Sequence, residues 1–492
     1  MEDSRLPVFK ALESMMDLES ILFLSISIFV FWVVVSGIYN LYISPLRKIP
    51  GPRIRALSNV PRIWEMMAGR DGIDHIDLHR VYGPIHDIYG PRKGHAAPPA
   101  KDKLFYQPPY NGVDSILGID DEAAHKQERK IMSAGFSERS LRDQEPLLKS
   151  WATKLGGKLR EQAIAGNKAD LVKFYNLTTF DIMADLTFGE SLNMLENEEY
   201  TPWVQTIFAW LSAVTALRGL RLLGPTPRLL IDRILMRLPA VRRLDKEHWE
   251  YSTARVRKRL QREPDHPDLW SHILQKSDIS GTSLERNFSN ASVFMIAGTE
   301  TTATALSGTT YHLLRNPAYL SRLKEELRSQ FFSTEELTFE SLARLPYLHA
   351  VLQEGMRMYP PVPAILPRIV PKGGLAICGE WVPAGTVVGV HQLATYRMEE
   401  HFSKPDEFHP QRWLKDLEFA KDQLNALEPF SVGPRDCLGK NLAWHEMRLL
   451  LATVLFQFDI QLSVESENWA EQSIYTLWQK KPLVCSLEAA AQ

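Results

Sequence analysis

One cysteine near the C-terminal end of the chain lies in a segment whose residue types are suited to holding a metal. Cys437 stands between Gly433 and Gly439, after a proline and with Arg435 two positions before it. Glycine and proline here favour a tight loop whose backbone can closely approach a large flat ligand. Residues 440–456 have a helical pattern, and a helix N-terminus favours the thiolate form of a cysteine. Because Arg435 adds positive charge, the segment predicts a thiolate able to bind a soft iron centre.

Two other interpretations compete with metal ligation at this position. A free cysteine is usually a small buried hydrophobe, and that interpretation suits Cys378 and Cys485, which lie within apolar strand-like runs. A phosphate-binding loop has the pattern G-x-x-x-x-G-K-S/T. Here the glycines are one residue further apart and Asn441 follows Lys440, so that pattern does not match. Metal ligation by Cys437 is the interpretation that the segment favours.

Polar residues also interrupt the apolar run Val293–Ile296 of a long predicted helix. Gly298, Glu300 and Thr301 follow this run. A charge inside a core helix is costly unless it is used. The missing Cβ of Gly298 would let a neighbour pack against the backbone or let the helix distort. A helix kink or a local Ser/Thr cluster is the alternative interpretation.

Two further pairs of polar residues share one face of a predicted helix. Glu354 and Arg357 are three residues apart, and His125 and Arg129 are four residues apart. Both spacings bring side chains together on a helix. The alternatives are a surface ion pair of little energetic value for the first pair and a solvated basic face for the second.

The elements that must position these residues are mostly helices. Apolar residues recur at helical spacing in many segments, and strand signals are confined to short stretches. The fold class predicted is therefore mainly α with a small β component, that is α+β. The helical segments are residues 120–135, 143–165, 178–187, 202–222, 242–262, 284–315, 318–330 and 347–358. The strand signals are residues 375–378 and 386–390, which resemble a hairpin, and residues 476–487.

Composition narrows the class of protein. The chain has 492 residues, of which 45% are hydrophobic, so it can bury a large core. Lys and Arg number 57 against 59 Asp and Glu. This balance argues against nucleic acid as a partner, because proteins that bind nucleic acid have a strongly basic face. The three cysteines are widely spaced and form neither a disulfide framework nor a C-x-x-C zinc pair, which indicates a reducing compartment.

The N-terminal region carries a candidate membrane anchor. No charged residue occurs between Ile21 and Leu46, and about 20 apolar residues suffice to span a bilayer as a helix. The preceding flank is acidic, whereas Arg47 and Lys48 follow the run, so the positive-inside rule places the C-terminal side in the cytosol. A signal peptide is the alternative, although the run is long for one and lacks a small-residue cleavage site. We expect a lumenal N-terminus over 1–20, a transmembrane helix over 21–43, an extended proline-rich hinge over 44–60 and a cytosolic domain over 61–492.

The segment Phe430–Gly439 fills every fixed position of the F-x-x-G-x-R-x-C-x-G haem-binding signature. By this motif the chain resembles the cytochrome P-450 monooxygenases, whose haem iron is held by a cysteine thiolate. The resemblance covers nearly the whole chain and implies the P-450 fold, with a long central helix, small β-sheets and a single N-terminal transmembrane helix. It implies iron protoporphyrin as the cofactor and Cys437 as the axial ligand to the metal. Residues implied around the cofactor are Phe430, Gly433 and Gly439 in the segment 430–439, which we call the ligand loop, and His125, Arg129, Arg368 and Arg435 at the propionates.

Two other motifs extend the resemblance. Residues 297–302 match the family's A/G-G-x-D/E-T-T/S pattern. The match implies that Thr301 holds dioxygen and that Glu300 relays protons to it through water. The E-x-x-R motif and the F-x-P-x-R-W element resemble a pair that forms a buried structural network in this family. The members of that network would be Glu354, Arg357 and Arg412.

The resemblance also implies the partners. The family inserts one oxygen atom of O2 into a lipophilic small molecule with electrons from NADPH. Since this chain shows no dinucleotide-binding glycine motif, we expect a separate NADPH-cytochrome reductase, with Lys126, Lys130 and Lys440 as candidates for its basic docking surface. The sequence most resembles fungal monooxygenases of secondary metabolism. This resemblance implies a protein of the endoplasmic reticulum membrane with its catalytic domain in the cytosol. By family position the substrate would contact residues 105–117, 204–220, the start of 294–301, 364–366 and 473–477, which are mainly apolar.

One region departs from the family pattern. After Tyr82–Pro84 only Ile85 and His86 precede Asp87, where a strand–turn–strand and helical lead-in would need about 15 residues. We infer a deletion near residues 84–87, beside the substrate entrance, which would expose a sheet edge. The deletion leaves open a non-catalytic or impaired haem-binding protein. A haem isomerase or dehydratase that does not use O2 is the other alternative.

Overall fold

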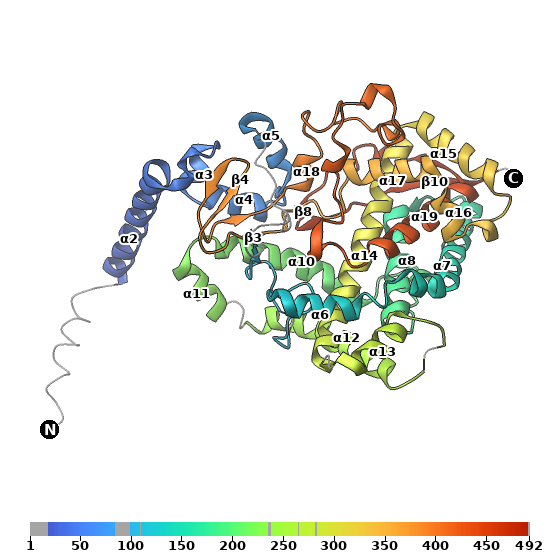
Figure 1. Ribbon diagram of the computed structural model, residues 1–492, viewed down its shortest axis with the longest axis horizontal. Coiled ribbons are helices and arrows are strands. Elements are labelled where there is room, and N and C mark those ends of the chain that lie inside the picture. Colours follow the sequence, from blue (N-terminus) through green and yellow to red (C-terminus); the bar gives the residue numbers. More distant parts are fainter. Residues whose placement is uncertain are drawn as a thin grey trace.

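The structure of the chain is a computed structural model that describes residues 18–83, 99–108, 110–234, 238–263, 265–280 and 283–490. The inferred deletion near residues 84–87 lies outside these ranges. Helices form most of the molecule (Figure 1), which confirms the mainly α fold. The helices are α2 (Leu18–Ile38), α3 (Arg53–Leu57), α4 (Val60–Met67), α5 (Ile73–Tyr82), α6 (Glu122–Met132), α7 (Glu138–Ile164), α8 (Leu171–Phe188), α9 (Met194–Asn197), α10 (Pro202–Arg221), α11 (Pro225–Arg233), α12 (Pro239–Leu260), α13 (Leu269–Ser280), α14 (Leu284–Arg315), α15 (Pro317–Gln330), α16 (Phe339–Ala343), α17 (Pro346–Met358), α18 (Gln392–Thr395) and α19 (Lys440–Gln457).

The long helix α14 forms the centre of the fold. It is continuous over the residues 284–315 that the helical spacing predicts, and it packs against α8, α12, α17 and α19 (Figure 1). Gly298 lies at the contact with α8, because a Cβ on it would lie 2.6 Å from the sulfur of Met183. Close packing, and not a kink in the helix, is therefore the reason for glycine at this position.

Short strands form four small sheets in the described part of the chain. The strands are β1 (Ala100–Lys101), β2 (Ala169–Asp170), β3 (Arg368–Ile369), β4 (Leu375–Ile377), β5 (Glu380–Val382), β6 (Val387–Val388), β7 (Phe458–Leu462), β8 (Ile474–Tyr475), β9 (Leu477–Trp478) and β10 (Val484–Ala489). Two sheets have the strand orders β1–β3–β6 and β2–β10–β7, and the other two are the hairpins β4–β5 and β8–β9.

The hairpin predicted from residues 375–378 and 386–390 is wrong in its pairing. β4 pairs with β5 through a turn at Cys378 and Gly379, and β6 pairs with β3 in another sheet. The two turn residues have φ angles of 49° and 85°, as the central residues of a tight type I′ hairpin turn require. The run 476–487 is likewise divided between β9 and β10, which lie in different sheets.

The predicted network of Glu354, Arg357 and Arg412 is present and fully buried. The Glu354 carboxylate accepts hydrogen bonds from Arg357 Nη2 at 2.8 Å, Arg412 Nε at 3.1 Å and Trp413 Nε1 at 2.9 Å. Burial alone would raise the pKa of Glu354, but the two arginines lower it to about 2. Arg412 also pairs with Asp422. The network therefore neutralises its own charge and ties α17 to the chain that leads to α19.

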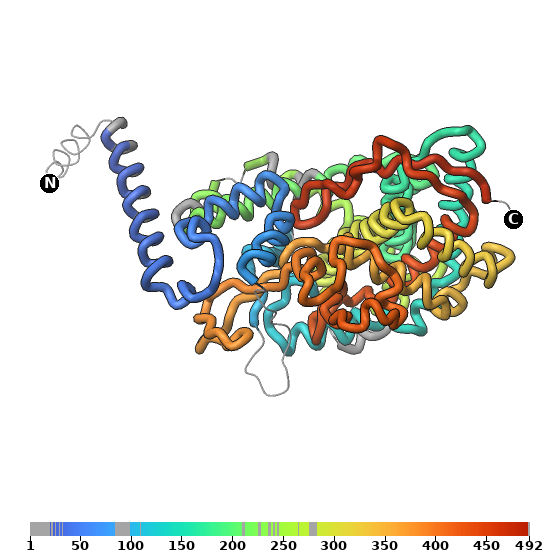
Figure 2. The backbone as a smooth tube through the Cα atoms, turned by 90° about the horizontal axis from the view of Figure 1, so that it is seen from above, coloured from blue at the N-terminus to red at the C-terminus, as the bar shows by residue number. Residues whose placement is uncertain are grey.

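The N-terminal helix α2 stands apart from the globular part of the molecule (Figure 2). Among the described residues, one helix is long and apolar enough to cross a membrane, with its most apolar window at Ile26–Ile43. By length and composition this window supports the span expected over 21–43. The hinge after it is not extended as predicted, because residues 45–48 form a 3-10 turn and α3 follows. Proline fits the first position of a helical turn, which is where Pro45 lies.

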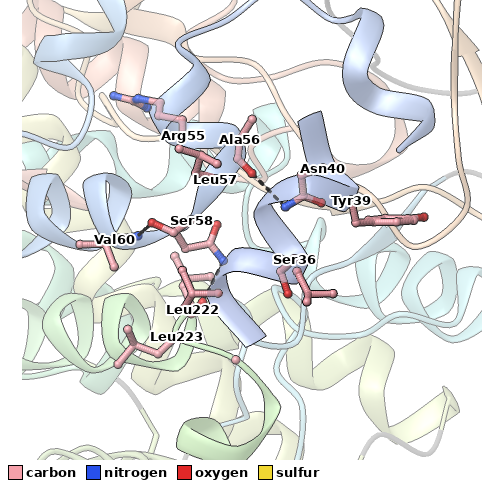
Figure 3. Close-up of a pocket in the computed structure, with 14 residues that line it drawn as sticks. Ser36, Tyr39, Asn40, Arg55, Ala56, Leu57, Ser58, Val60, Leu222 and Leu223 are labelled. Carbon is pink, nitrogen blue, oxygen red and sulfur yellow. Dashed lines mark hydrogen bonds between the residues drawn. The ribbon is translucent and has the colours of Figure 1, made fainter. Parts of the chain in front are cut away.

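The end of the anchor contacts the globular part through α3. Asn40 Nδ2 donates to the carbonyl of Ala56 at 2.9 Å. A Cβ on Gly37 would lie 2.8 Å from the side chain of Leu57, so the two backbones approach closely. A cavity of about 570 Å³ lies beside this contact, lined by the anchor, by α3 and by the residues that follow α10 (Figure 3).

Candidate functional site

The loop before α19 folds as its glycines predict. Gly433 and Ser431 have φ angles of 81° and 60°, a left-handed conformation that glycine adopts without strain. The backbone N–H of Cys437 donates to the carbonyl of Phe430 at 2.8 Å and closes the loop. α19 begins directly after Gly439, which is its N-cap. The structure therefore places Cys437 two residues before this N-cap.

We expect the Cys437 side chain to face an internal space. It is accessible to solvent, yet burial has the largest influence on its thiol and raises the pKa. A side chain that is both accessible and desolvated lines a cavity and not the outer surface. A hydrogen bond from the backbone N–H of Gly439 favours the thiolate, as do Arg129 and Lys440 more weakly.

Two expectations about this thiol need correction. The pKa of Cys437 is raised and not lowered, because desolvation outweighs the hydrogen bond from the Gly439 N–H and the charges of Arg129 and Lys440. Arg435 does not turn towards the sulfur but donates to the carbonyls of Ile119 and Asp120 at 2.6 and 2.8 Å. A thiol of this kind releases its proton when a metal binds to it.

Two buried cations face each other on the sheet β1–β3–β6. The register pairs Lys101 of β1 directly with Arg368 of β3, and their exposed fractions are only 4% and 9%. Like charges directly opposite each other destabilise a sheet. Arg368 donates to the hydroxyl of Tyr106 at 2.8 Å, and Lys101 donates to the carbonyl of Leu117. Both charges therefore have neutral hydrogen-bond partners.

Arg435 and His125 share this environment with Lys101 and Arg368. Burial, followed by the charges of Arg435 and Lys101, lowers the pKa of His125 to about 4. Burial, followed by the charges of Arg368 and Arg435, lowers the pKa of Lys101 to about 7. These effects show that the charges of Lys101, Arg368 and Arg435 oppose one another and disfavour a proton on His125. We refer to Lys101, His125, Arg368 and Arg435 as the cation cluster.

The cation cluster has a surplus of positive charge. Asp120, an acidic residue close to two of its members, pairs with Lys103 at 3.2 Å. Arg129, predicted to join the same site, pairs with Asp436 and donates to its carbonyl at 2.7 Å. A buried surplus of charge needs a counter-ion. The two carboxylates of a porphyrin would supply it through charge-assisted hydrogen bonds, so the cluster fits such a cofactor.

Glu300 and Thr301 are neighbours on α14 but have different partners. Thr301 Oγ1 donates to the carbonyl of Ala297 at 2.7 Å. Glu300 is buried and forms an ion pair with Lys480, whose ammonium group also donates to Thr304 Oγ1 at 2.9 Å. The second carboxylate oxygen of Glu300 is buried and has no partner among the described residues. Ala297 is exposed although it lies in the core helix, so this stretch of α14 also borders an internal space.

Two buried lysines of the site were not predicted from the sequence. Lys101 stands beside Asp102 and Lys103, a composition typical of an exposed charged turn, and its burial follows only from pairing with β3. Lys480 lies within the alternating run 476–487. A lysine is normally exposed, so its position inside an apolar run was the one signal for a buried partner.

Comparison with known proteins decides the family. The family model for Cytochrome P450 matches residues 85–485. The chain belongs to the cytochrome P450 family. Cytochrome P450 monooxygenase efuB of Hormonema carpetanum is 44% identical over 95% of this chain and 96% of its own length. Cytochrome P450 monooxygenase astJ of Aspergillus oryzae is 40% identical over 92% of this chain and 94% of its own. The trichothecene C-15 hydroxylase of Fusarium sporotrichioides is 39% identical over 92% and 95%.

As a cytochrome P450, the protein is an oxidoreductase of the monooxygenase type, and its cofactor is haem with a cysteine thiolate as axial ligand. The similarity to fungal monooxygenases of secondary metabolism is confirmed. Cys485 is buried in β10, and Cys378 lies in the turn between β4 and β5. Cys437 is therefore the candidate thiolate of this P450.

Proposed function

We propose that this P450 holds its haem through Cys437 and inserts one oxygen atom of O2 into a lipophilic fungal secondary metabolite. One observation carries the proposal: an accessible, desolvated thiol lies two residues from Arg435, a member of a buried cluster with surplus positive charge. The haem, when bound, supplies oxygen activation supported by electron donation from the thiolate. Hydroxylases among the relatives favour hydroxylation as the reaction type.

The ligand loop orients the sulfur in this proposal. The hydrogen bond from Cys437 N–H to Phe430 fixes the loop, and the N–H of Gly439 stabilises negative charge on the sulfur. Gly433 supplies the left-handed turn. The ammonium group of Lys440 lies 5.8 Å from the centroid of the Phe430 ring, which holds this ring beside the loop.

The cation cluster neutralises the two propionates. Arg368 and Arg435 present guanidinium groups that can each bind a carboxylate through two hydrogen bonds, and both charges act on His125. Arg129 acts on the cofactor only indirectly, because it pairs with Asp436 beside the ligand loop. We assign Arg129 as a positioning residue.

Glu300 and Thr301 handle protons for oxygen activation. The Thr301 hydroxyl positions the dioxygen, and Glu300 passes protons to it through water. Lys480 holds one carboxylate oxygen of Glu300, while the other oxygen has no partner among the described side chains. The second oxygen is thus free to accept a proton, and Lys480 is a positioning residue for this step.

The anchor and a basic surface determine the partners. We place the anchor in the endoplasmic reticulum membrane as a single span, with residues 61–492 in the cytosol. Lys126, Lys130 and Lys440 are exposed on α6 and α19, the two helices that flank the ligand loop. An NADPH-cytochrome reductase with an acidic face would dock here, on the surface beside the ligand loop.

The reduced, carbon-monoxide-bound absorption spectrum tests the ligand. The wild-type protein is expected to show the red-shifted band of a thiolate-ligated haem, and Cys437→Ser is expected to lose it. Cys485→Ser is the matched control, because Cys485 lies in β10 away from the ligand loop, and it should keep the band. A thiolate band in Cys437→Ser would refute the assignment.

Oxygen consumption with NADPH and a reductase tests the reaction. Thr301→Ala is expected to consume O2 but to release hydrogen peroxide in place of oxidised product, because proton delivery is no longer directed. A haem isomerase or dehydratase would consume no O2 in this assay. A non-catalytic haem protein would bind haem normally and turn over no substrate.

A further inference from the structure

Arg218, on the helix α10, is a further arginine that lies outside the cation cluster. The Arg218 guanidinium donates to the carbonyl of Phe105 at 2.9 Å and to Thr476 Oγ1 at 3.3 Å, and it lies 4.3 Å from the centroid of the Phe105 ring. A guanidinium has five N–H donors. Its Nε is buried and without a partner. Arg218 therefore keeps hydrogen-bonding capacity that the protein does not use.

The charge of Arg218 is not neutralised by a carboxylate. No acidic group among the residues that the structure describes forms an ion pair with it. Burial lowers its pKa to about 10, and the nearby Arg221 contributes to this decrease. Tyr106 and then Asp102 oppose this effect, but neither forms an ion pair with Arg218 in the described part of the chain. A desolvated cation without a counter-ion is costly unless a ligand supplies one.

Arg221, one turn along the same helix, shows the opposite arrangement. It is 6% exposed and pairs with Asp232 at 2.7 Å, so its charge is satisfied within the protein. Arg218 is partly accessible, as a residue that meets a ligand must be. The two arginines of α10 thus have different roles, one structural and one open to a ligand.

Three segments expected to line the substrate site meet at Arg218. α10, the loop that contains Phe105 and the β8–β9 turn that contains Thr476 lie far apart in sequence but are joined by this one side chain. Thr476 also bonds to Thr215 at 3.0 Å, which places its hydroxyl beside α10. Tyr106, whose hydroxyl accepts a hydrogen bond from Arg368, also affects the pKa of Arg218, so Arg218 lies on the side of Tyr106 that these three segments share.

We propose that Arg218 binds a carboxylate of the substrate, so that the substrate is an amphipathic acid with a lipophilic body and one anionic group. The inference rests on the proposed monooxygenase function, for which it names the substrate class. A planar guanidinium with unused N–H donors matches a carboxylate by geometry as well as by charge. The apolar remainder of the site accommodates the body of the molecule.

Paired ligands test this assignment with the haem-loaded full chain. The probes are dodecanoic acid, hexadecanoic acid and deoxycholic acid, each compared with its methyl ester, and binding is followed by the change in the haem absorption spectrum. The wild-type protein is expected to bind at least one acid about tenfold more tightly than its ester, the effect of one charge-assisted interaction. Arg218→Gln should reduce this ratio to about one, and Arg218→Lys should keep part of it.

The ratio of acid to ester separates recognition from structure. If Arg218 only braced the three segments, Arg218→Gln would weaken acids and esters equally and leave the ratio unchanged. Arg221→Gln is the matched control, because it removes a structural arginine from the same helix and should leave the ratio as in the wild type. The proposal is overturned if no acid binds better than its ester or if Arg218→Gln keeps the preference. The carbon-monoxide spectrum distinguishes this failure from a failure of the proposed function, since only the latter abolishes the thiolate band in the wild type.

Discussion

Two buried groups of charges in this P450 are built in opposite ways. In the Glu354 network two arginines face two carboxylates, and all the charges are neutralised within the protein. In the cation cluster, Lys101 and Arg368 are directly opposite each other and donate to neutral groups. The first arrangement holds the fold together, whereas the second leaves positive charge that an external anion could neutralise. Internal charge balance is thus what separates a structural network from a binding site.

The same distinction applies to single side chains. Arg221 and Arg218 lie on one helix, and only the first has a carboxylate partner within the described part of the protein. Lys480 and Glu300 form an intermediate case, because the pair is neutral overall but leaves one carboxylate oxygen unused. A group that is neutral and fully bonded is expected to matter for stability, and a group with unused capacity is expected to matter for ligands or for chemistry.

Glu354→Gln breaks the balanced network and should have the largest effect on stability. The substitution keeps the shape of the side chain but leaves Arg357 and Arg412 with one carboxylate between them, so the free energy of unfolding should fall by about 3–5 kcal/mol. Chemical denaturation of the haem-loaded protein measures this. Glu340→Gln is the control: its pair with Arg344 is exposed by more than 70% on both sides, and its loss should cost at most about 1 kcal/mol. Equal effects of the two substitutions would contradict the comparison.

Lys480→Met tests the intermediate case. The substitution leaves Glu300 as an unpaired buried charge, and we expect a loss of about 3 kcal/mol in the free energy of unfolding. The double variant Glu300→Gln/Lys480→Met should regain most of this loss, because no uncompensated charge remains. Additive effects of the two single substitutions in this double-mutant cycle would show that the pair is not coupled.

His312 is a buried histidine close to the Glu354 network, and its protonation would add a positive charge there. Burial, followed by Arg397 and Arg357, lowers its pKa from 6.5 to about 3. The unfolded chain therefore takes up a proton at a higher pH than the folded protein does. Stability from this group is complete above pH 6.5 and declines as the pH falls, by up to about 2 kcal/mol at about pH 5. His312→Gln should flatten this part of the pH profile of unfolding.

His266 is the control of opposite sign for that pH profile. Its hydrogen bond to Asp185 raises its pKa, so the folded protein holds the proton more tightly than the unfolded chain does. Its contribution is complete below the ordinary histidine pKa and is lost as the pH rises. His266→Gln should therefore reduce stability at low pH and leave it unchanged at high pH. If both variants changed the pH dependence of the free energy of unfolding in the same direction, the opposite pKa shifts assigned to the two histidines would be wrong.

Local sequence signals predicted the parts of the fold that depend on local chemistry. The helical spacing gave α14 with its bounds at Leu284 and Arg315, and the glycines around Cys437 gave the ligand loop. The Glu354 network followed from motifs of the family. The pairing of β4 was wrong, because cysteine rarely adopts the positive φ that Cys378 has in the turn.

The unpredicted residues are those whose role arises from tertiary pairing. Lys101 acquires its role because β1 pairs with β3, a contact between positions far apart in the chain. The partner of Glu300 comes from a segment 180 residues later. Arg435 was expected at the propionates, yet its carbonyl contacts at Ile119 and Asp120 carry no sequence signal. The sequence lists the charged residues but does not show which of them come together in the fold. A local surplus of charge therefore cannot be predicted from it.

Lys101→Met tests the comparison of the two charge groups at the cation cluster, and its expected effect is the smallest of these substitutions. It removes one of two like charges that face each other in the sheet, so the protein without its cofactor should lose no stability. The same change removes a counter-charge for the propionates, and haem should leave the protein about tenfold faster. Transfer of haem to an excess of a haem-scavenging protein measures this rate without any turnover.

Lys103→Met is the matched control for that measurement. Lys103 lies two residues further along the chain and is 43% exposed, and it pairs with Asp114 and Asp120. Since its charge is already balanced, its removal should leave the rate of haem loss unchanged. If Lys101→Met retained haem as the wild type does, Lys101 would not belong to the anion site, and the surplus charge would have to be assigned to Arg368, Arg435 and His125 alone. The difference between these two neighbouring lysines therefore measures how far internal charge balance separates a structural cation from a cofactor-binding one.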